Sequence, residues 1–360
     1  MGILQYGCCY GGCNETGKQS FLSMMQKRKT ALVVLFNHNY EKNIPVIKKL
    51  YKNRFSQIKI LMPFYYGDDE DVIHVYGNSF VFHTYIAQAK EKLMQMDCDD
   101  FLIIGDDLLL NPELCENNIH EKLAMPNGAF YIDAVEDVSK CDYNRPVLEA
   151  SRFSPYFPGL DGSANRCVPG FDEALQILQS KNLISFTRLS RWKPFYPLFK
   201  KGWIKNFREN YKIFKARVWH FLKVLQYKIR AVDMPYPYVF GYSDILMIPR
   251  EKMLAWCSYL EVFATWNMFV EMAIPTAMML LPETTVCFAN QTRYKTGNVW
   301  YPQNPRHFDC ISSIINKVVE NSATPDELAS KFPMEYLYLH PVKLSRYNKS
   351  HLTESISACQ

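Results

Sequence analysis

The sequence has no long apolar run. None of its stretches reaches the about 18 uninterrupted apolar residues that a membrane-spanning helix needs. The nearest candidate, residues 260–281, contains Glu261, Asn267, Glu271 and Pro275, and predicts a buried core helix that breaks at Pro275. The start of the chain also lacks the basic and apolar regions of a secretory signal. We therefore expect a cytoplasmic protein, with peripheral membrane contact as its closest approach to a bilayer.

Several catalytic motifs are missing as well. The chain has no GxxxxGK[ST] loop, no GxGxxG after its first apolar run, no GxSxG elbow and no zinc-protease or deaminase spacing. These absences argue against P-loop, dinucleotide-binding, α/β-hydrolase and zinc-hydrolase classes. The eleven cysteines are odd in number and irregular in spacing, which predicts reduced thiols rather than a disulfide framework.

What is present is a strongly apolar, aromatic-rich chain. Hydrophobic residues make up 48% of its 360 residues and charged residues 21%, so it can bury a core of one large domain or two ordinary ones. Four short apolar runs alternate with amphipathic stretches in the first 135 residues. The expected strands are 31–37, 57–62, 100–105 and 129–133, and the expected helices are 41–53 and 80–96.

This alternation predicts an α/β fold with a Rossmann-like, open, mostly parallel sheet flanked by helices. Ligands of such sheets bind at the carboxyl ends of the strands. Further along the chain, prolines and glycines predict loops over 142–180. The later expected strands are 239–249, 285–288 and 335–339, and the later expected helices lie within 250–281, 307–320 and 325–331.

The strongest chemical signal is the acidic pair Asp106–Asp107, directly after the apolar run 100–105. Two carboxylates at the end of a buried strand are costly unless a cation compensates them. A magnesium-type ion is commonly held by one or two carboxylates together with substrate phosphates. The alternative is that the pair only opens a turn, since Asn111–Pro112 shows turn chemistry a few residues later.

A strand that ends in an acidic pair, inside a nucleotide-binding α/β half, resembles the metal-binding DXD region of GT-A glycosyltransferases. In that family the motif holds Mn²⁺ or Mg²⁺ against the diphosphate of a nucleotide sugar. Here Gly105 stands where the first acid is expected. The resemblance implies that Asp107 is a metal ligand and that Asp106 contacts the ribose or the metal.

Other segments resemble parts of the same fold. The run 31–37, ending in Asn37 and followed by His38 and Asn39, is similar to the first strand and the loop under the nucleotide base, and 36–51 resembles the opening of STELLO-like glycosyltransferases. The resemblance assigns nucleotide-sugar contacts to these three residues. Asp161, in PGLDGS, is a candidate for binding the acceptor, although the pattern favours a simple Asp-Gly turn.

The resemblance also extends to 241–249 and 266–278. In inverting members an acid on the later helix is the catalytic base, and Glu271 is the best match, with Asp244 as its competitor. Several such families supply a late histidine to the metal, a role that His340 fits. The alternatives are a structural ion pair for Glu271, a turn cap for Asp244 and simple packing for His340.

Residues 181–230 have a distinct composition. They hold fourteen Lys and Arg but a single acid, Glu209, so their charge is +13 and the rest of the chain carries −8. Apolar residues recur mostly three or four positions apart from Trp203 to Leu225, which predicts a basic amphipathic helix. We expect this basic helical segment, 188–230, to contact an anionic membrane surface. Packing on the core is the alternative, and nucleic acid is not an expected partner.

With the resemblance, the chain divides into six parts: a loosely ordered leader (1–28), a nucleotide-sugar-binding α/β half (29–140), a loop-rich acceptor region (141–180), a basic aromatic helical insertion (181–235), an acceptor and catalytic half completing the same domain (236–345), and a tail (346–360). The implied function is metal-dependent transfer of a sugar from a nucleotide-diphosphate donor, a UDP-sugar, to a hydroxyl of a glycan or lipid-linked acceptor. A metal-dependent nucleotidyltransferase and a non-catalytic membrane or nucleic-acid adaptor are the alternatives.

Overall fold

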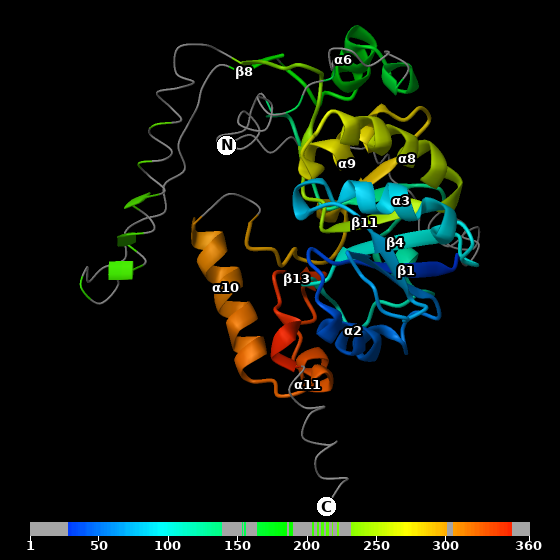
Figure 1. Cartoon of the computed structure of the whole chain (residues 1–360). Helices are drawn as coiled ribbons and strands as arrows, with labels where there is room; N and C mark the ends of the chain where they lie inside the picture. Colours follow the sequence, from blue (N-terminus) through cyan, green and yellow to red (C-terminus); the bar gives the residue numbers. More distant parts are fainter. Residues whose placement is uncertain are drawn as a thin grey trace, which may run out of the picture.

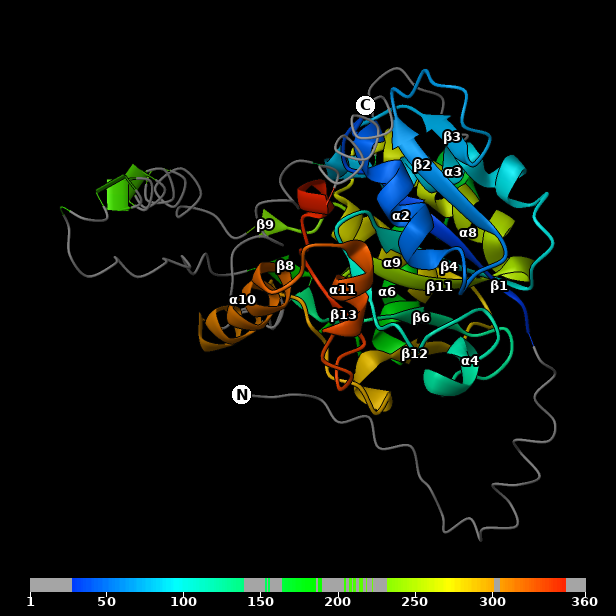
Figure 2. The same ribbon diagram turned by 90° about the horizontal axis from the view of Figure 1, so that it is seen from below.

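A seven-stranded sheet forms the centre of the protein (Figure 1). The computed structural model describes residues 28–138, 164–185, 187–189, 232–300 and 305–347, with residues 153, 155, 204, 207, 208, 210, 211, 214, 215, 218 and 222. The strand order is β3-β2-β1-β4-β11-β6-β12 (Figure 2). The strands are β1 (Thr30–Leu35), β2 (Ile58–Pro63), β3 (Val72–Val75), β4 (Asp100–Gly105), β6 (Phe130–Ile132), β11 (Ile245–Pro249) and β12 (Val286–Phe288).

The sheet is mostly parallel. Only β11 runs against its neighbours, pairing antiparallel with both β4 and β6. The predicted α/β class with a mostly parallel sheet is therefore confirmed, and the architecture is compatible with a Rossmann-like fold. Strands from the first 135 residues and from the last third of the chain interleave in this one sheet.

Helices cover both faces of the sheet. Successive residues of a strand point to opposite sides, so each strand contributes side chains to both cores. Val33 of β1 packs in one core and Val34 in the other. One face carries α3 (His83–Leu93), α8 (Arg250–Thr265) and α9 (Val270–Leu280), and the other carries α2 (Ile44–Tyr51), α10 (Pro305–Glu320) and α11 (Pro325–Ser330) (Figure 1). Other helices whose bounds lie within the described residues are α4 (Ile119–Lys122), α6 (Phe171–Ser180) and the 3-10 turns Glu41–Asn43, Ser79–Val81, Ala164–Cys167, Ala289–Gln291 and Leu344–Tyr347.

Three small antiparallel pairs join segments that are distant in the sequence. They are β5 (Leu109–Leu110) with β13 (Tyr338–Leu339), β7 (Val135–Glu136) with β10 (Phe240–Gly241), and β8 (Arg188–Leu189) with β9 (Val232–Asp233). The first pair brings the C-terminal segment beside the residues that follow β4. The last pair joins the two ends of the stretch that contains most of the basic helical segment.

A buried ion pair fixes the amino end of β4. The Asp100 carboxylate is fully buried and accepts hydrogen bonds from Arg28 Nε at 2.6 Å and Nη2 at 3.0 Å. His120 Nε2 lies 2.7 Å from the same carboxylate. Arg28 therefore belongs to the folded body rather than to the expected leader.

Two local expectations are wrong. Residues 171–180, expected as part of a loop-rich region, form α6, because Ala174 and Leu178 lie one helical turn apart and both are buried. The helical stretch 250–281 breaks at Asn267 rather than at Pro275. Asn267 has φ of 56°, the left-handed conformation that ends helices, whereas Pro275 sits within α9.

In the part of the chain that the structure describes, no helix is both long enough and apolar enough to span a bilayer.

Candidate functional site

The carboxyl ends of β1 and β4 meet at a topological switch point. From β1 the chain builds β2 and β3 on one side and then crosses to β4 on the other. In such sheets, ligands bind in the crevice outside the strand ends at this point. Here Asp106 N donates to Leu35 O at 2.8 Å, and Asn37 N donates to Asp106 Oδ1 at 3.3 Å. The acidic pair thus contacts the loop that follows β1.

Asp106 and Asp107 occupy the centre of a tight turn, which Leu108 N closes by donating to Gly105 O at 3.1 Å. The expectation of turn chemistry is correct locally, but it does not explain why both turn residues are acidic. Burial and the adjacent Asp107 charge raise the pKa of Asp106 to about 7. Such a carboxyl is held partly protonated at neutral pH and gains from a compensating cation.

Asp244 reaches the same edge of the sheet because β11 is antiparallel, so that its amino end lies beside the carboxyl end of β4. Gly105 N donates to Asp244 O at 3.0 Å. A Cβ atom built on Gly105 would lie 3.4 Å from Asp107 Oδ1 and 3.7 Å from Asp244 Oδ1. The space that a side chain at position 105 would enter is therefore bordered by two carboxylates. Burial raises the pKa of Asp244 further than the nearby His340 lowers it.

His340 comes to the site on the C-terminal segment. It follows β13, which pairs with β5 just after the acidic turn. His340 Nε2 lies 3.0 Å from Asp107 Oδ1, and Nδ1 lies 2.7 Å from the hydroxyl of the buried Tyr242. Although burial lowers the pKa of His340, the charges of Asp244, Asp107 and Asp106 raise it above its ordinary value.

Tyr242 connects His340 with Asp244. Its hydroxyl hydrogen-bonds the Asp244 carboxylate as well as the imidazole. Partners of this kind fix the tautomer of a metal-binding histidine. At 3.0 Å from a carboxylate oxygen, His340 Nε2 carries a proton and donates it to Asp107 Oδ1, so a metal ion held by this pair would displace that proton.

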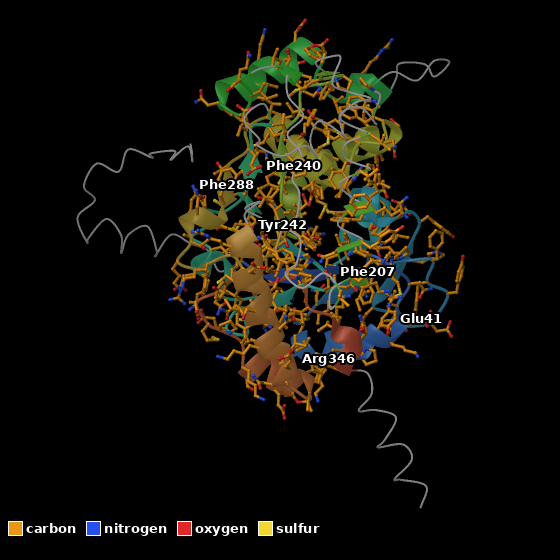
Figure 3. All side chains as sticks on the ribbon, turned by 90° about the vertical axis from the view of Figure 1, so that its left-hand side faces the viewer. Glu41, Phe207, Phe240, Tyr242, Phe288 and Arg346 are labelled. Carbon is orange, nitrogen blue, oxygen red and sulfur yellow. The ribbon has the colours of Figure 1, made fainter. Side chains whose placement is uncertain are left out.

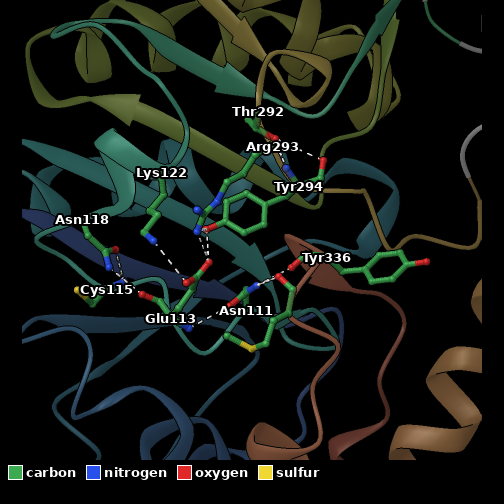
Figure 4. Close-up of polar contacts among 10 residues, drawn as sticks. Asn111, Glu113, Cys115, Asn118, Lys122, Thr292, Arg293, Tyr294 and Tyr336 are labelled. Atoms are coloured by element: carbon green, nitrogen blue, oxygen red, sulfur yellow. Dashed lines mark hydrogen bonds and ion pairs between the residues drawn. The ribbon is translucent and has the colours of Figure 1, made fainter. Parts of the chain in front are cut away.

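A second group of contacts fixes the segment that carries His340 (Figure 4). The fully buried Asn111 donates from Nδ2 to Tyr336 O at 2.7 Å and to Met334 O at 3.1 Å. Next to it, Glu113 accepts hydrogen bonds from the Tyr294 hydroxyl and from Arg293 Nη2. The turn chemistry predicted at Asn111 thus also anchors β13 to β5.

The sequence reasoning missed Asp133, which follows β6 at the same edge of the sheet. Tyr338 donates to Asp133 Oδ2 at 2.7 Å, and Asn298 Nδ2 lies 3.3 Å from the same oxygen. Asp133 Oδ1 is buried and has no partner among the described residues. Burial and the Asp244 charge raise its pKa to about 7, against the lowering effect of the Tyr338 hydrogen bond. The sequence did hold a signal for Asp133: the apolar run AFYID ends in an acid, just as Asp106 follows the apolar run 100–105.

The other predicted site residues are more scattered. His38 and Asn39 are exposed in the loop after β1, and Asn39 Nδ2 donates to Phe64 O at 2.6 Å. Glu271 lies half-buried in the first turn of α9 and is not one of the residues joined by the contacts above. Asp161 lies outside the described residues, as does most of the basic helical segment 188–230.

The donor set at the switch point fits a hard divalent cation only in part. Within the described residues, no three His, Cys, Asp or Glu side chains form a ready-made metal site. However, Asp107 Oδ1 and His340 Nε2, which lie 3.0 Å apart in a hydrogen bond, are two donors that would hold a shared cation if one bound. Two protein donors would leave the other positions to water and phosphate oxygens, as is usual for Mg²⁺.

Comparison with protein-family models and with curated proteins gives no match for this chain.

Proposed function

We propose that this protein is a metal-dependent glycosyltransferase of the GT-A type, which moves a sugar from a UDP-sugar to a hydroxyl of a glycan or lipid-linked acceptor. One observation carries the proposal. The acidic turn after β4 lies at the switch point of the sheet, where the loop after β1, Asp244 from β11 and His340 from β13 converge on it. Four chain segments that are far apart in sequence supply polar groups to one edge of the sheet, where the strands end.

The donor nucleotide is assigned to the edge of the sheet where β1 and β4 end. The half-buried Asn37 and the exposed His38 and Asn39 flank this position on the β1 side. Asp106, whose pKa is raised to about 7, is suited to hydrogen-bond a ribose hydroxyl from the other side. Its contact with Asn37 N ties the two sides together.

Asp107 and His340 are the residues that would hold Mn²⁺ or Mg²⁺, with Asp106 beside them. When bound, such an ion neutralises the charge that develops on a diphosphate leaving group. Asp244 replaces, in space, the first acid that the sequence lacks at Gly105, because its carboxylate borders the position toward which a side chain there would point. Tyr242 holds both Asp244 and His340 in place.

Glu271 remains the candidate base if the reaction inverts the sugar configuration. A general base must lie within hydrogen-bonding reach of the acceptor hydroxyl, away from the leaving group. Asp244 faces Asp107 and His340, on the side assigned to the diphosphate. The two acids therefore receive different roles. Loss of turnover with intact donor binding is expected for Glu271→Gln, whereas Asp244→Asn weakens donor binding.

The test is a thermal-shift screen of UDP-, GDP- and CMP-sugars with and without Mn²⁺. We expect a UDP-sugar to stabilise the protein only when Mn²⁺ is present. Asp107→Asn should abolish that shift, and the matched control Asp68→Asn, an exposed acid in the loop before β3, should retain it. Stabilisation that survives Asp107→Asn would refute the proposal.

A radiolabelled donor then separates the rival chemistries. A glycosyltransferase transfers the labelled sugar from UDP to the acceptor or to water and releases UDP. A nucleotidyltransferase instead moves label between a nucleoside triphosphate and a sugar phosphate and releases pyrophosphate. A non-catalytic adaptor shows neither reaction and no metal-dependent shift.

A further inference from the structure

An apolar stripe lies on the described helical residues of the basic helical segment. It consists of Phe207, Tyr211, Phe214, Val218 and Leu222, all of which are helical and exposed. Their exposed fractions run from 42% at Val218 to 61% at Phe207. At about 100° per residue, positions 207, 211, 214, 218 and 222 fall within an arc of about 80°, which is the spacing of one helix face.

The described helical pieces that carry the stripe lie to one side of the two cores of the body. Figures 1 and 2 both draw the described helical pieces of this stretch to one side of the sheet and its helices, and Figure 3, viewed from that side, labels Phe207. The chain leaves the body at β8 and returns to it at β9, where Arg188 pairs with Asp233. Packing on the core, the alternative to a membrane role, therefore does not hold for these five residues.

The charge beside the stripe is positive. Arg208 and Lys215 are exposed and lie within about 40° of its edge on the same helix. Residues 204–222 contain five basic side chains and one acid, and the longer stretch 181–230 carries +13 against −8 for the remainder. An apolar face with a basic flank complements a surface that is anionic outside and apolar beneath.

The make-up of the stripe favours lipid over nucleic acid. Single-stranded nucleic acids bind to aromatic platforms, on which successive bases stack. In this stripe the aromatic rings give way to the aliphatic Val218 and Leu222 on the same face. Aliphatic side chains add nothing to base stacking, but they gain fully from entering hydrocarbon.

We propose that the apolar stripe docks the protein on an anionic phospholipid bilayer. The five stripe residues enter the acyl boundary, and the flanking Arg208 and Lys215 contact lipid phosphates and carboxylates. This docking is independent of the proposed glycosyltransferase activity, because it is measured with lipid alone.

The test is sedimentation of the full-length protein with vesicles of phosphatidylcholine, with and without phosphatidylserine. We expect binding to the anionic vesicles that falls steeply with added salt. Phe207→Ser/Phe214→Ser should weaken binding at least about tenfold. Arg208→Gln and Lys215→Gln should each weaken it about fivefold.

Matched controls lie elsewhere on the surface. Tyr66→Ser/Leu254→Ser removes an aromatic and an aliphatic side chain that are comparably exposed, and Lys52→Gln removes an exposed charge. Both variants should bind vesicles as the unchanged protein does. Circular dichroism and melting temperature check that all variants fold equally.

Three results would overturn the proposal. The first is no sedimentation with anionic vesicles at low salt. The second is binding that Phe207→Ser/Phe214→Ser leaves unchanged while it abolishes binding to single-stranded RNA, which would assign the stripe to nucleic acid. The third is a dimer in analytical ultracentrifugation that the same variant dissociates without affecting vesicle binding, which would make the stripe an interface between two copies of the chain.

Discussion

His83 predicts how the protein responds to acid. It is the first residue of α3, is fully buried, and neither ring nitrogen has a hydrogen-bond partner in the described part of the chain. Burial lowers its pKa from 6.5 to about 3. Between these values the unfolded chain binds a proton that the folded protein excludes, so the free energy of unfolding falls as the pH drops below 6.5.

The size of the effect follows from the shift. One pKa unit corresponds to about 1.4 kcal/mol, so the loss is about 2 kcal/mol at about pH 5 and approaches about 5 kcal/mol near pH 3. His83→Met keeps a similar volume and removes the proton-binding site. We expect this variant to be more stable at neutral pH, since a buried unpaired polar group costs about 1–3 kcal/mol, and to gain a further 2 kcal/mol or so at about pH 5.

Urea denaturation at about pH 7.5 and about pH 5 measures both parts. The control is Leu254→Met, which changes an exposed side chain that cannot titrate and should leave the pH dependence of the unfolding free energy unchanged. If the unchanged protein and His83→Met lose equal stability between the two pH values, His83 is not buried in its neutral form and the reasoning fails.

Three other substitutions test the site. Gly105→Ala places a methyl group in ordinary contact with Asp107 and Asp244, so it should fold normally but lose the Mn²⁺-dependent thermal shift with UDP-sugars. Burial raises the pKa of Asp133 to about 7, so near pH 5 the folded protein binds a proton that the unfolded chain does not. As the pH rises from about 5 to about 8, the unchanged protein should therefore lose about 2.5 kcal/mol of unfolding free energy, measured by urea denaturation, that Asp133→Asn does not lose. Asn111→Ala leaves two backbone carbonyls without partners and should cost about 2–4 kcal/mol, read from the same urea curves.

Local patterns predict the buried parallel strands well. The run 100–105 coincides with β4. A strand that is covered on both faces is apolar at nearly every position, and an apolar run of only six residues is too short for a typical helix. The acidic pair at its end is equally visible. The sequence pattern does not predict β3, because its four residues, VIHV, alternate in burial over too short a run to show a period.

Pairing between distant segments has no such local signal. Nothing near residues 245–249 indicates that β11 inserts between β4 and β6 in the reverse direction, yet that reversal places Asp244 beside Asp107. The approach of His340 depends on the two-residue pairing of β13 with β5, more than 200 positions away in sequence. The sequence suggested both residues through a family resemblance, whereas the role of Tyr242 emerges only from the fold and Asp133 has only the local signal of an acid at the end of an apolar run.

The position of the basic helical segment in the chain links the two proposals. The last residue of the stripe, Leu222, precedes Asp244 by 22 residues, so the two positions are at most about 80 Å apart along an extended chain. The intervening residues include β9, which pairs with β8, and β10, which pairs with β7 just beyond Asp133. A stripe that enters a bilayer therefore keeps Asp244 within that distance of the bilayer. Of the two acceptor classes considered, this arrangement favours the lipid-linked one, because such an acceptor presents its hydroxyl near the membrane surface and a soluble glycan gains nothing from docking.

Phe207→Ser/Phe214→Ser should accordingly reduce transfer to a lipid-linked acceptor in vesicles while leaving donor hydrolysis in solution unchanged. Equal loss of both activities would contradict the link between docking and acceptor.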